Sequence, residues 1–313
     1  MTVPVVVTGA TGFVAATLIP VLMRHGHAVR AVTRGTDRAV PAGAMRMVVP
    51  DPGSSAMLRD AMAGASAIVH LAARVHVMQE TATDALAAYR AANVDATLAC
   101  ARQAAELGVP RFVYLSSVKV FGEQGHFAED DAPHPSDPYG VSKQEAEERL
   151  RALGRDSGMD VVIVRPPLVY GPGVRANFAA LQRLVARGVP LPLGAVRNRR
   201  SYVAVDNLAD AIRAMLEFRG RIDQTFTITD GHDVSTPELI RAMANAMQRP
   251  ARLVPVPPRL VLAAATLVGR QALVHRLIGS LSFDSNRART LLGWTPPHTM
   301  DDVLRRMHAA SAR

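Results

Sequence analysis

The stretch that decides the fold is Val3–Val7, followed at once by Thr8-Gly9-Ala10-Thr11-Gly12-Phe13-Val14-Ala15. The first run is continuously apolar, which is typical of a parallel strand covered on both faces. Gly9 permits a tight turn after this strand, and Gly12 lets the backbone approach a pyrophosphate held at the amino end of a helix. This order of strand, glycine turn and helix predicts dinucleotide binding, with cofactor contacts from Gly9, Thr11, Gly12, Phe13 and Val14.

Further apolar runs along the first half of the chain predict more parallel strands. They lie at Val29–Thr33, Arg46–Val49, Ala67–Leu71, Phe112–Leu115 and Val161–Val164. Helix-compatible segments separate them, at Gly12–His25, Ser55–Ala63, Ala85–Leu107 and Pro138–Leu153. Repeated βαβ units of this kind predict an α/β fold with a Rossmann-like doubly wound parallel sheet.

The second half of the chain differs, because prolines cluster after Pro166 and the helical stretches there are weaker. We expect residues 1–170 to form the dinucleotide-binding Rossmann domain, with a strand near 225–229 that returns to its sheet. Residues 171–313 are expected to form mainly a smaller C-terminal lobe that binds the substrate and is interleaved with the first domain.

Composition excludes several classes of protein. The 313 residues are 49% hydrophobic, carry a formal net charge of +9, and include 4% aromatic residues, ten histidines and one cysteine, Cys100. The apolar content excludes disorder over most of the chain, and a single cysteine excludes a disulfide framework. Dispersed arginines with few aromatics favour an anionic small molecule over a nucleic acid as partner. The histidines show no metal-ligand spacing, so we expect no metal.

The sequence also bears on location. Val3–Val7 has no basic region before it and runs into a glycine turn, unlike a signal peptide. The longest uncharged apolar stretch, Leu260–Gly269, is about half of the roughly 20 residues that span a bilayer. We therefore expect a cytoplasmic protein without stable membrane insertion. That stretch predicts a buried helix, with a peripheral membrane or partner contact as the alternative.

The ends of the other predicted strands supply more candidate cofactor contacts. NAD sites usually place an acidic residue about 20 residues after the glycines, where it holds the ribose 2′-hydroxyl. This chain instead has Arg34, whose guanidinium can pair with a 2′-phosphate, so NADP(H) is favoured over NAD(H). Asp51-Pro52 is the candidate for contacting the adenine amine. The small residues of Leu71-Ala72-Ala73 leave room beside which the cofactor can run.

Two segments in the middle of the chain predict a proton-transfer site. Leu115-Ser116-Ser117 ends the fifth strand, and Tyr139 and Lys143 are four residues apart, so both project from one helix face. A phenol titrates near pH ~10, and a neighbouring ammonium and a positive nicotinamide ring both lower that pKa. We predict that Tyr139 moves the proton on a substrate oxygen, which Ser117 also hydrogen-bonds. Lys143 lowers the tyrosine pKa and holds the nicotinamide ribose.

Taken together, these residues resemble the extended short-chain dehydrogenase/reductase family of the NAD-dependent epimerase/dehydratase type. The resemblance covers essentially the whole chain and includes His70–Ala73, Asn93-Val94-Asp95, Ser116–Gly122, Arg165-Pro166, Tyr170-Gly171-Pro172 and Leu291–Pro296. It implies a Rossmann domain with bound NAD(P), a UDP-sugar substrate in the C-terminal lobe, and a homodimer that pairs the helices Ala85–Leu107 and Pro138–Leu153. It also implies cofactor contacts from Asn93, Tyr139, Lys143 and Pro166.

The same resemblance implies how the substrate diphosphate is held. Arg200 matches the family arginine that grips it, and a guanidinium fork suits two phosphate oxygens. Asn177 matches a second family position on the diphosphate. The family usually has aspartate after the arginine, whereas this chain has Ser201, which leaves open what supports Arg200. A solvated pair of arginines on a loop is the alternative.

The reaction is narrowed by two further positions. Family dehydratases carry an Asp-Glu pair directly after the hydroxyl residue of the fifth strand, and here those positions are Val118 and Lys119. Arg34 and the resemblance to bacterial surface-polysaccharide enzymes favour a UDP-4-keto-6-deoxy-N-acetylhexosamine 4-reductase. The alternative is a UDP-hexose 4-epimerase acting on UDP-glucose or UDP-GlcNAc. A non-catalytic dinucleotide-binding interaction protein is a remote third possibility.

Overall fold

A computed structural model describes residues 3–50, 55–75, 84–267, 269 and 271–311. Within these residues, one sheet of parallel strands has the order β10-β7-β5-β4-β1-β2-β3. The strands are β1 (Val5–Thr8), β2 (Val29–Thr33), β3 (Met45–Val48), β4 (Ala67–His70), β5 (Arg111–Leu115), β7 (Asp160–Arg165) and β10 (Thr225–Thr227). Strand order proceeds outward from β1 in both directions, which confirms the predicted Rossmann-like doubly wound sheet.

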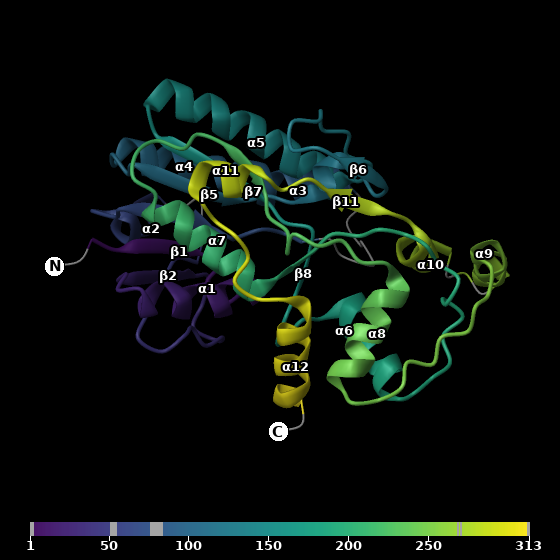
Figure 1. Ribbon diagram of the computed structural model, residues 1–313. Coiled ribbons are helices and arrows are strands. Elements are labelled where there is room, and N and C mark those ends of the chain that lie inside the picture. The colour runs from purple at the N-terminus through teal and green to yellow at the C-terminus, as the bar shows by residue number, and fades with distance from the viewer. Residues whose placement is uncertain (1–2, 51–54, 76–83, 268, 270, 312–313) are drawn as a thin grey trace.

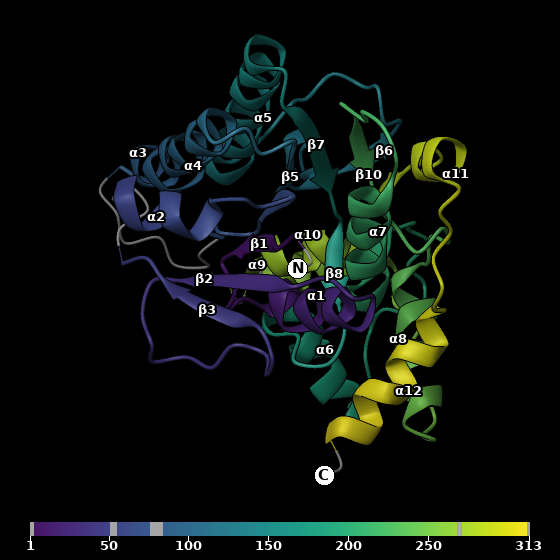
Figure 2. The ribbon, with the colours of Figure 1, turned by 90° about the vertical axis from the view of Figure 1, so that its left-hand side faces the viewer.

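Helices cover both faces of this sheet because successive strand residues point to opposite sides. Val5 and Val7 of β1 pack in the same apolar layer as α1 (Phe13–Arg24) and α7 (Val205–Glu217). Val6 packs in the opposite layer with α2 (Ser55–Met62), α4 (Ala96–Glu106) and α5 (Pro138–Ser157). Figure 2 shows the two layers on either side of the sheet. Two covered faces account for strands whose residues are mostly apolar on both sides.

The predicted helix Ala85–Leu107 is interrupted. Its parts are α3 (Ala85–Arg90), a π-helical turn at Ala91–Asp95, and α4. Asn93 lies in the π-helical turn and is fully buried. Such turns often occur at functional sites because they reorient a side chain without ending the helix.

A smaller lobe lies beside the carboxyl ends of the strands, at the right of Figure 1. Its core contains residues of the parallel pair β8 (Leu168–Tyr170) and β9 (Tyr202–Ala204) and of α6 (Ala176–Ala186), α8 (Thr236–Ala246) and α12 (Met300–Ser311). The helices α9 (Pro258–Leu267) and α10 (Gln271–Ile278) extend from it, and α11 (Arg287–Leu292) packs near β10. β11 (Leu281–Phe283) pairs with β6 (Gly125–Phe127), which ties the lobe to the segment after β5.

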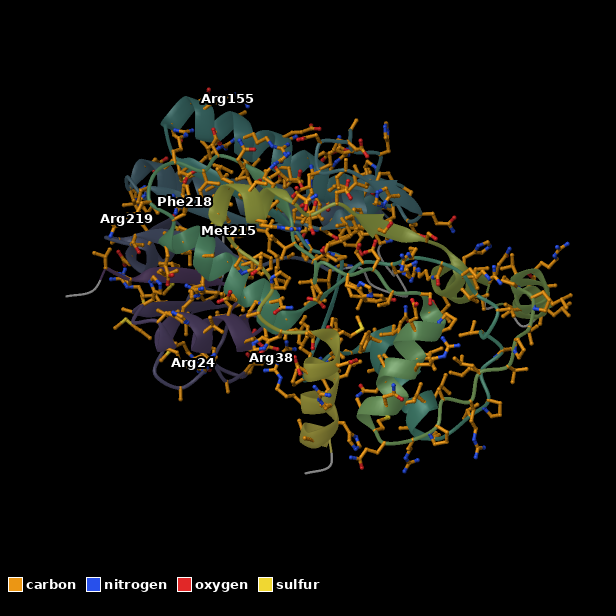
Figure 3. All side chains as sticks on the ribbon, in the orientation of Figure 1. Arg24, Arg38, Arg155, Met215, Phe218 and Arg219 are labelled. Atoms are coloured by element: carbon orange, nitrogen blue, oxygen red, sulfur yellow. The ribbon has the colours of Figure 1, made fainter. Side chains whose placement is uncertain are left out.

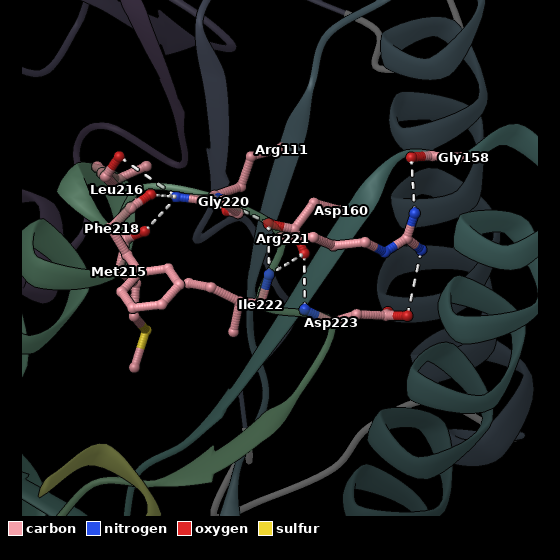
Figure 4. Close-up of polar contacts among 10 residues, drawn as sticks. All are labelled: Arg111, Gly158, Asp160, Met215, Leu216, Phe218, Gly220, Arg221, Ile222 and Asp223. Atoms are coloured by element: carbon pink, nitrogen blue, oxygen red, sulfur yellow. Dashed lines mark hydrogen bonds and ion pairs between the residues drawn. The ribbon is translucent and has the colours of Figure 1, made fainter. Parts of the chain in front are cut away.

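A buried ion pair fastens the opposite, amino-terminal edge of the strands. Arg111 donates from Nε to Asp160 at 2.7 Å and from its terminal nitrogens to the carbonyls of Met215, Phe218 and Gly220 (Figure 4). The Asp160 carboxylate also accepts from the backbone of 222 and 223. We call this group the Arg111–Asp160 clasp. Its guanidinium donates to carbonyls at the carboxyl end of α7, and a positive charge there also interacts favourably with the helix dipole.

A hollow of about 390 Å³ opens beside the clasp. Its lining includes the first residues of four strands, namely Val5, Ala67, Arg111 and Asp160. Open α/β sheets bind their ligands at the carboxyl ends of the strands, so this hollow is on the wrong edge to hold the dinucleotide.

The basic side chains are distributed widely. Exposed arginines such as Arg24, Arg38, Arg155 and Arg219 lie on separate parts of the surface (Figure 3). None of the helices in the described part of the chain has the length and apolar character that a membrane crossing requires.

Candidate active site

The glycine turn lies at the carboxyl end of β1. Gly9 has φ +66°, and a Cβ there would lie 2.7 Å from the backbone nitrogen of Ala72, so only glycine fits between β1 and the segment after β4. Gly12 is the N-cap of α1 and is exposed, and it has no side chain to cover the backbone N–H groups of the first helical turn. This leaves those donors open to an anion.

The neighbouring predicted cofactor residues surround this turn. Thr11 is exposed on it, whereas Phe13 and Val14 are half-buried in the first turn of α1. Leu71, Ala72 and Ala73 follow β4 directly, beside Gly9. The structure therefore brings together the two strand ends, β1 and β4, from which the sequence predicted contacts.

His70, at the end of β4, ties the same two strands together. Thr8 Oγ1 lies 3.0 Å from His70 Nδ1, and Thr97 Oγ1 lies 3.1 Å from His70 Nε2. Burial, reinforced by the charge of Lys143, lowers the pKa of His70 to about 3. The imidazole is therefore neutral at physiological pH and holds the turn in place by hydrogen bonding.

Four further residues were predicted as cofactor contacts, namely Arg34, Asp51, Pro52 and Asn93. Arg34 is exposed just beyond β2. Asp51 and Pro52 lie outside the described residues. Asn93 uses both ends of its amide within the protein: Oδ1 accepts from Arg74 N at 2.8 Å, and Nδ2 donates to Arg74 O and to Ser142 Oγ, each at 3.0 Å. It fixes the segment after Ala73 against α5, and its contact with a cofactor stays a prediction.

Tyr139 and Lys143 lie in the first turns of α5, whose start is well defined. Asp137 is the N-cap and accepts from the backbone of Gly140 at 2.7 Å, and Pro138 occupies the first turn. Lys143 is buried, and its Nζ donates to the carbonyl of Leu115 at 2.8 Å and to the hydroxyl of Tyr114 at 3.1 Å. The end of β5 thus fixes the lysine.

Consecutive residues at the end of β5 pair with residues one helical turn apart on α5. Leu115 accepts from Lys143, Ser116 donates to Glu147 at 2.5 Å, and Ser117 forms a hydrogen bond with Tyr139. The spacing 139, 143, 147 places the three helix residues on one face. We call this arrangement the β5–α5 ladder. It brings the predicted residues Ser117, Tyr139 and Lys143 together.

Burial controls the protonation of the two catalytic candidates. Burial raises the pKa of Tyr139 to about 12, and the hydrogen bond with Ser117 opposes that shift. Burial lowers the pKa of Lys143 to about 7, and the negative charge of Glu147 opposes that shift. The prediction that Lys143 and a nicotinamide ring together lower the pKa of the phenol stays a prediction, because burial is the largest influence on Tyr139 among the protein's own groups. Lys143 Nζ lies 5.9 Å from the centre of the Tyr139 ring.

Glu147 is a site residue that the sequence reasoning missed. Its carboxylate is fully buried and accepts from Arg165 Nη2 at 2.5 Å and from Arg151 Nη2 at 3.1 Å. The continued spacing after Tyr139 and Lys143 was a usable signal, because it put an acid on the same helix face.

Pro166, the remaining cofactor prediction, follows Arg165, and its carbonyl accepts from Val118 N at 3.2 Å.

The predicted substrate residues lie in the lobe. Arg200 is half-buried and exchanges backbone hydrogen bonds with Val234, and its Nη1 donates to the carbonyl of Gly279 at 2.9 Å. Ser201, at the position where the family has aspartate, donates to Asp233 at 2.5 Å. An acid therefore does lie next to Ser201, but it is Asp233, from a different segment of the chain.

Asn177 occupies the start of α6, directly after Ala176, which has φ +56°. A non-glycine residue in the left-handed region is uncommon and costs about 1–3 kcal/mol, and such strain gathers at binding sites. In the described residues, no group of three or more His, Cys, Asp or Glu side chains could hold a metal ion.

Comparison with known proteins identifies the family. The sequence model of the NAD dependent epimerase/dehydratase family matches residues 5–228. UDP-glucose 4-epimerase of Vibrio cholerae is 40% identical over 304 residues, covering 95% of this chain and 92% of that protein. The structure of MoeE5 in complex with UDP-glucose and NAD is 29% identical with a TM-score of 0.78, covering 99% of each chain. The protein with these β1, β5 and α5 sites belongs to the NAD dependent epimerase/dehydratase family.

Proposed function

We propose that the protein is an NAD-dependent 4-epimerase of a UDP-hexose. The observation that carries this proposal is the 40% identity to the Vibrio cholerae UDP-glucose 4-epimerase, which extends over nearly the whole of both chains. The β5–α5 ladder supports it, since a hydroxyl, a phenol and an ammonium meet where a sugar alcohol must lose and regain a proton. Val118 and Lys119 lack the acid and base that dehydration needs.

The glycine turn fits a dinucleotide. Gly12 is exposed at the start of α1, and a Cβ there would crowd the carbonyl of Gly9 at 3.1 Å. The open N–H groups of that turn would hold the pyrophosphate. The structurally similar MoeE5 was solved with NAD, which favours NAD over NADP, and we assign the exposed Arg34 no role in excluding it.

Bound NAD supplies the acceptor for the C4 hydride and, when oxidised, a positive ring beside the phenol. Tyr139 takes the proton from the C4 hydroxyl as C4 is oxidised. It returns the proton to that oxygen after the ketosugar has rotated to present its other face. Because burial holds the pKa of the phenol near 12, Tyr139 needs a second positive charge besides Lys143 to act as a phenolate. Ser117 donates a hydrogen bond to the same sugar oxygen.

The lobe would bind the nucleotide half of the substrate. Arg200 donates from Nη1 to the carbonyl of Gly279 and also interacts with the Tyr202 hydroxyl, and its remaining N–H groups would bind phosphate oxygens. Its neighbour strand β11 pairs with β6, so backbone hydrogen bonds join the lobe to the segment after Ser117. This link would keep the diphosphate at a constant distance from Tyr139.

The decisive experiment incubates the purified protein with UDP-glucose and, separately, with UDP-GlcNAc, with and without added NAD. Proton NMR of the anomeric signals is expected to show the 4-epimer, with no net change in nicotinamide absorbance. Tyr139→Phe is expected to lower kcat about 10²–10⁴-fold. If neither sugar is converted, the epimerase proposal is wrong.

A second candidate is a 4-reductase of a UDP-4-keto-6-deoxy-N-acetylhexosamine in surface-polysaccharide biosynthesis. It is favoured by Arg34, because a cofactor that is exchanged each turnover is commonly NADPH and no acid stands at the end of β2. Stoichiometric oxidation of NADPH by that ketosugar, without interconversion of UDP-hexoses, would decide for the reductase.

We also propose a homodimer built on α4 and α5. These two helices pack side by side in the same layer of the sheet (Figure 2), and the family resemblance pairs them across a two-fold axis. Light scattering on the eluted protein is expected to give twice the 33.5 kDa chain mass. A mass of one chain at micromolar concentration would refute the dimer.

A further inference from the structure

The helix α9 leaves one apolar face uncovered. Val261 and Ala265 are buried in the lobe, whereas Leu260 is 58% and Leu267 89% exposed. Ala263 and Ala264 are exposed between these leucines, so positions 260, 263, 264 and 267 form one stripe at helical spacing. We call these four residues the α9 stripe. A soluble surface helix ordinarily carries polar residues on this side.

The charged residues of the chain segment around α9 are all basic, although Arg276 of this segment pairs with Glu123 from the segment after β5. From Leu239 to Phe283 the sequence contains no aspartate or glutamate, and it contains six arginines, namely Arg241, Arg249, Arg252, Arg259, Arg270 and Arg276. Arg259 is itself exposed on α9, next to Leu260. A cationic segment of this kind concentrates at anionic surfaces, and arginine can keep its head in water while its stem lies on apolar material.

The position of α9 suits a flat partner. With α10 it forms the end of the lobe farthest from β1, at the right edge of Figure 1. A projecting ridge with a narrow apolar stripe can lie on a lipid surface without matching a groove, whereas a protein partner would need a complementary pocket. Since no described helix can cross a membrane, the contact would be peripheral.

We propose that α9 lies on an anionic phospholipid surface, with the α9 stripe in the interface and Arg259 near the headgroups. The association is weak and reversible, because few apolar side chains enter the interface. It is independent of which sugar the active site converts. It places the C-terminal lobe at the membrane while the Rossmann sheet remains in water.

The test is sedimentation of the purified full chain with vesicles of phosphatidylcholine alone and with ~30% phosphatidylglycerol at low salt. Binding is expected only to the anionic vesicles and is expected to disappear at high salt, where screening is short-ranged. The double variant Leu260→Gln, Leu267→Gln is expected to lower the partition coefficient about tenfold. Arg259→Gln is expected to lower it about fivefold.

The matched control is the double variant Met57→Gln, Leu291→Gln, whose side chains are also exposed, at 51% and 41%, on α2 and α11. It is expected to bind vesicles like the unchanged protein, and both double variants are expected to retain activity on free substrate. Absence of binding to anionic vesicles, or equal binding by the α9 double variant, would overturn the proposal. So would a fall in oligomeric mass of the α9 variant without vesicles, because a second copy would then cover the stripe.

Discussion

At the scale of single residues, the site depends on charges that are buried together. Lys143 and Glu147 lie one turn apart on α5, and the acid is also paired with Arg165 from β7. Burying two charges is costly unless they are paired and hydrogen-bonded, and here Glu147 is paired with Arg165 from β7 and with Arg151 from its own helix. The charge of Glu147 thus opposes the fall that burial causes in the pKa of Lys143.

Glu147→Gln keeps the size of the side chain and removes its charge. The charge of Glu147 opposes the fall in the Lys143 pKa, so without it that pKa drops further below about 7. The ammonium is then lost at lower pH, and the alkaline limb of the kcat/KM profile is expected to move to lower pH. Glu148→Gln, exposed on the same helix, is the control and is expected to leave the limb in place. An unmoved limb in Glu147→Gln would contradict this role.

Arg200 is expected to contribute to binding of the UDP-sugar and not to the hydride- and proton-transfer steps. Arg200→Met is expected to raise KM for the UDP-sugar about 10- to 100-fold with kcat within a few-fold, since a charge-assisted hydrogen bond contributes roughly 1.5–3 kcal/mol. Steady-state kinetics on the preferred sugar measures both constants. Arg199→Met, an exposed neighbour, is the control and should change neither. A fall in kcat alone would assign Arg200 to the transition state instead.

Sequence could predict some of these residues and not others, for a physical reason. Ser117, Tyr139 and Lys143 follow local rules, because a strand end and a helix face are set by near neighbours along the chain. The partner of Ser201 is Asp233, and the partner of Glu147 is Arg165, and in each pair the two residues come from different elements. Those pairings depend on how elements pack, which periodicity does not encode.

At the scale of elements, the glycine turn is the most demanding piece of backbone. Gly9→Ala is expected to weaken NAD binding strongly and to destabilise the protein, because the residue has φ +66° and its Cβ would clash with Ala72. Gly26→Ala is a matched control: its φ is +83°, with no atom within 4 Å of the added Cβ. The Gly26→Ala variant is expected to lose only about 1–2 kcal/mol of stability, from placing a residue with a Cβ at positive φ.

Titration of NAD by calorimetry and thermal unfolding separate these effects. The control should lose some thermal stability and keep its affinity for NAD. Equal affinities for the two variants would show that the close approach of β1 to the segment after β4 is not needed for the cofactor.

Elements were predictable where a repeating pattern dictates them. Val29–Thr33 is bounded as expected, because a covered parallel strand is mostly apolar, although this one includes the half-buried Arg30. The π-helical turn at Ala91–Asp95 was not predictable from the sequence. It contains Asn93, whose buried hydrogen bonds go to Arg74 and Ser142, and these residues are distant along the chain. The stretch Leu260–Gly269 was expected to be a buried helix, but α9 is buried only on one face.

At the scale of the whole molecule, stability and catalysis are placed at opposite edges of the sheet. Arg111→Met would leave the Asp160 carboxylate buried without its cation and the carbonyls after α7 without a donor. We expect a loss of roughly 3–5 kcal/mol in the free energy of unfolding. Activity per folded molecule is expected to be unchanged, since the clasp lies at the amino ends of the strands.

Chemical denaturation and measurement of kcat on the same preparations of Arg111→Met test whether the clasp affects stability without affecting activity. Arg221→Met removes a half-exposed partner of Asp223 close by and is expected to cost less than about 1 kcal/mol. If Arg111→Met lowered kcat of the folded protein, the two edges of the sheet would have to be coupled.

The edge strand β10 has a consequence for how the chain is made. It hydrogen-bonds to β7 along Ile163–Arg165, although the whole segment 166–224 is synthesised between them. During translation β7 therefore leaves the ribosome with a bare edge for roughly 3–12 s. Unpaired strand edges recruit other chains. A gene fragment that stops at residue 170 is expected to aggregate in the cell, and the nascent full chain is expected to need protection until β10 arrives.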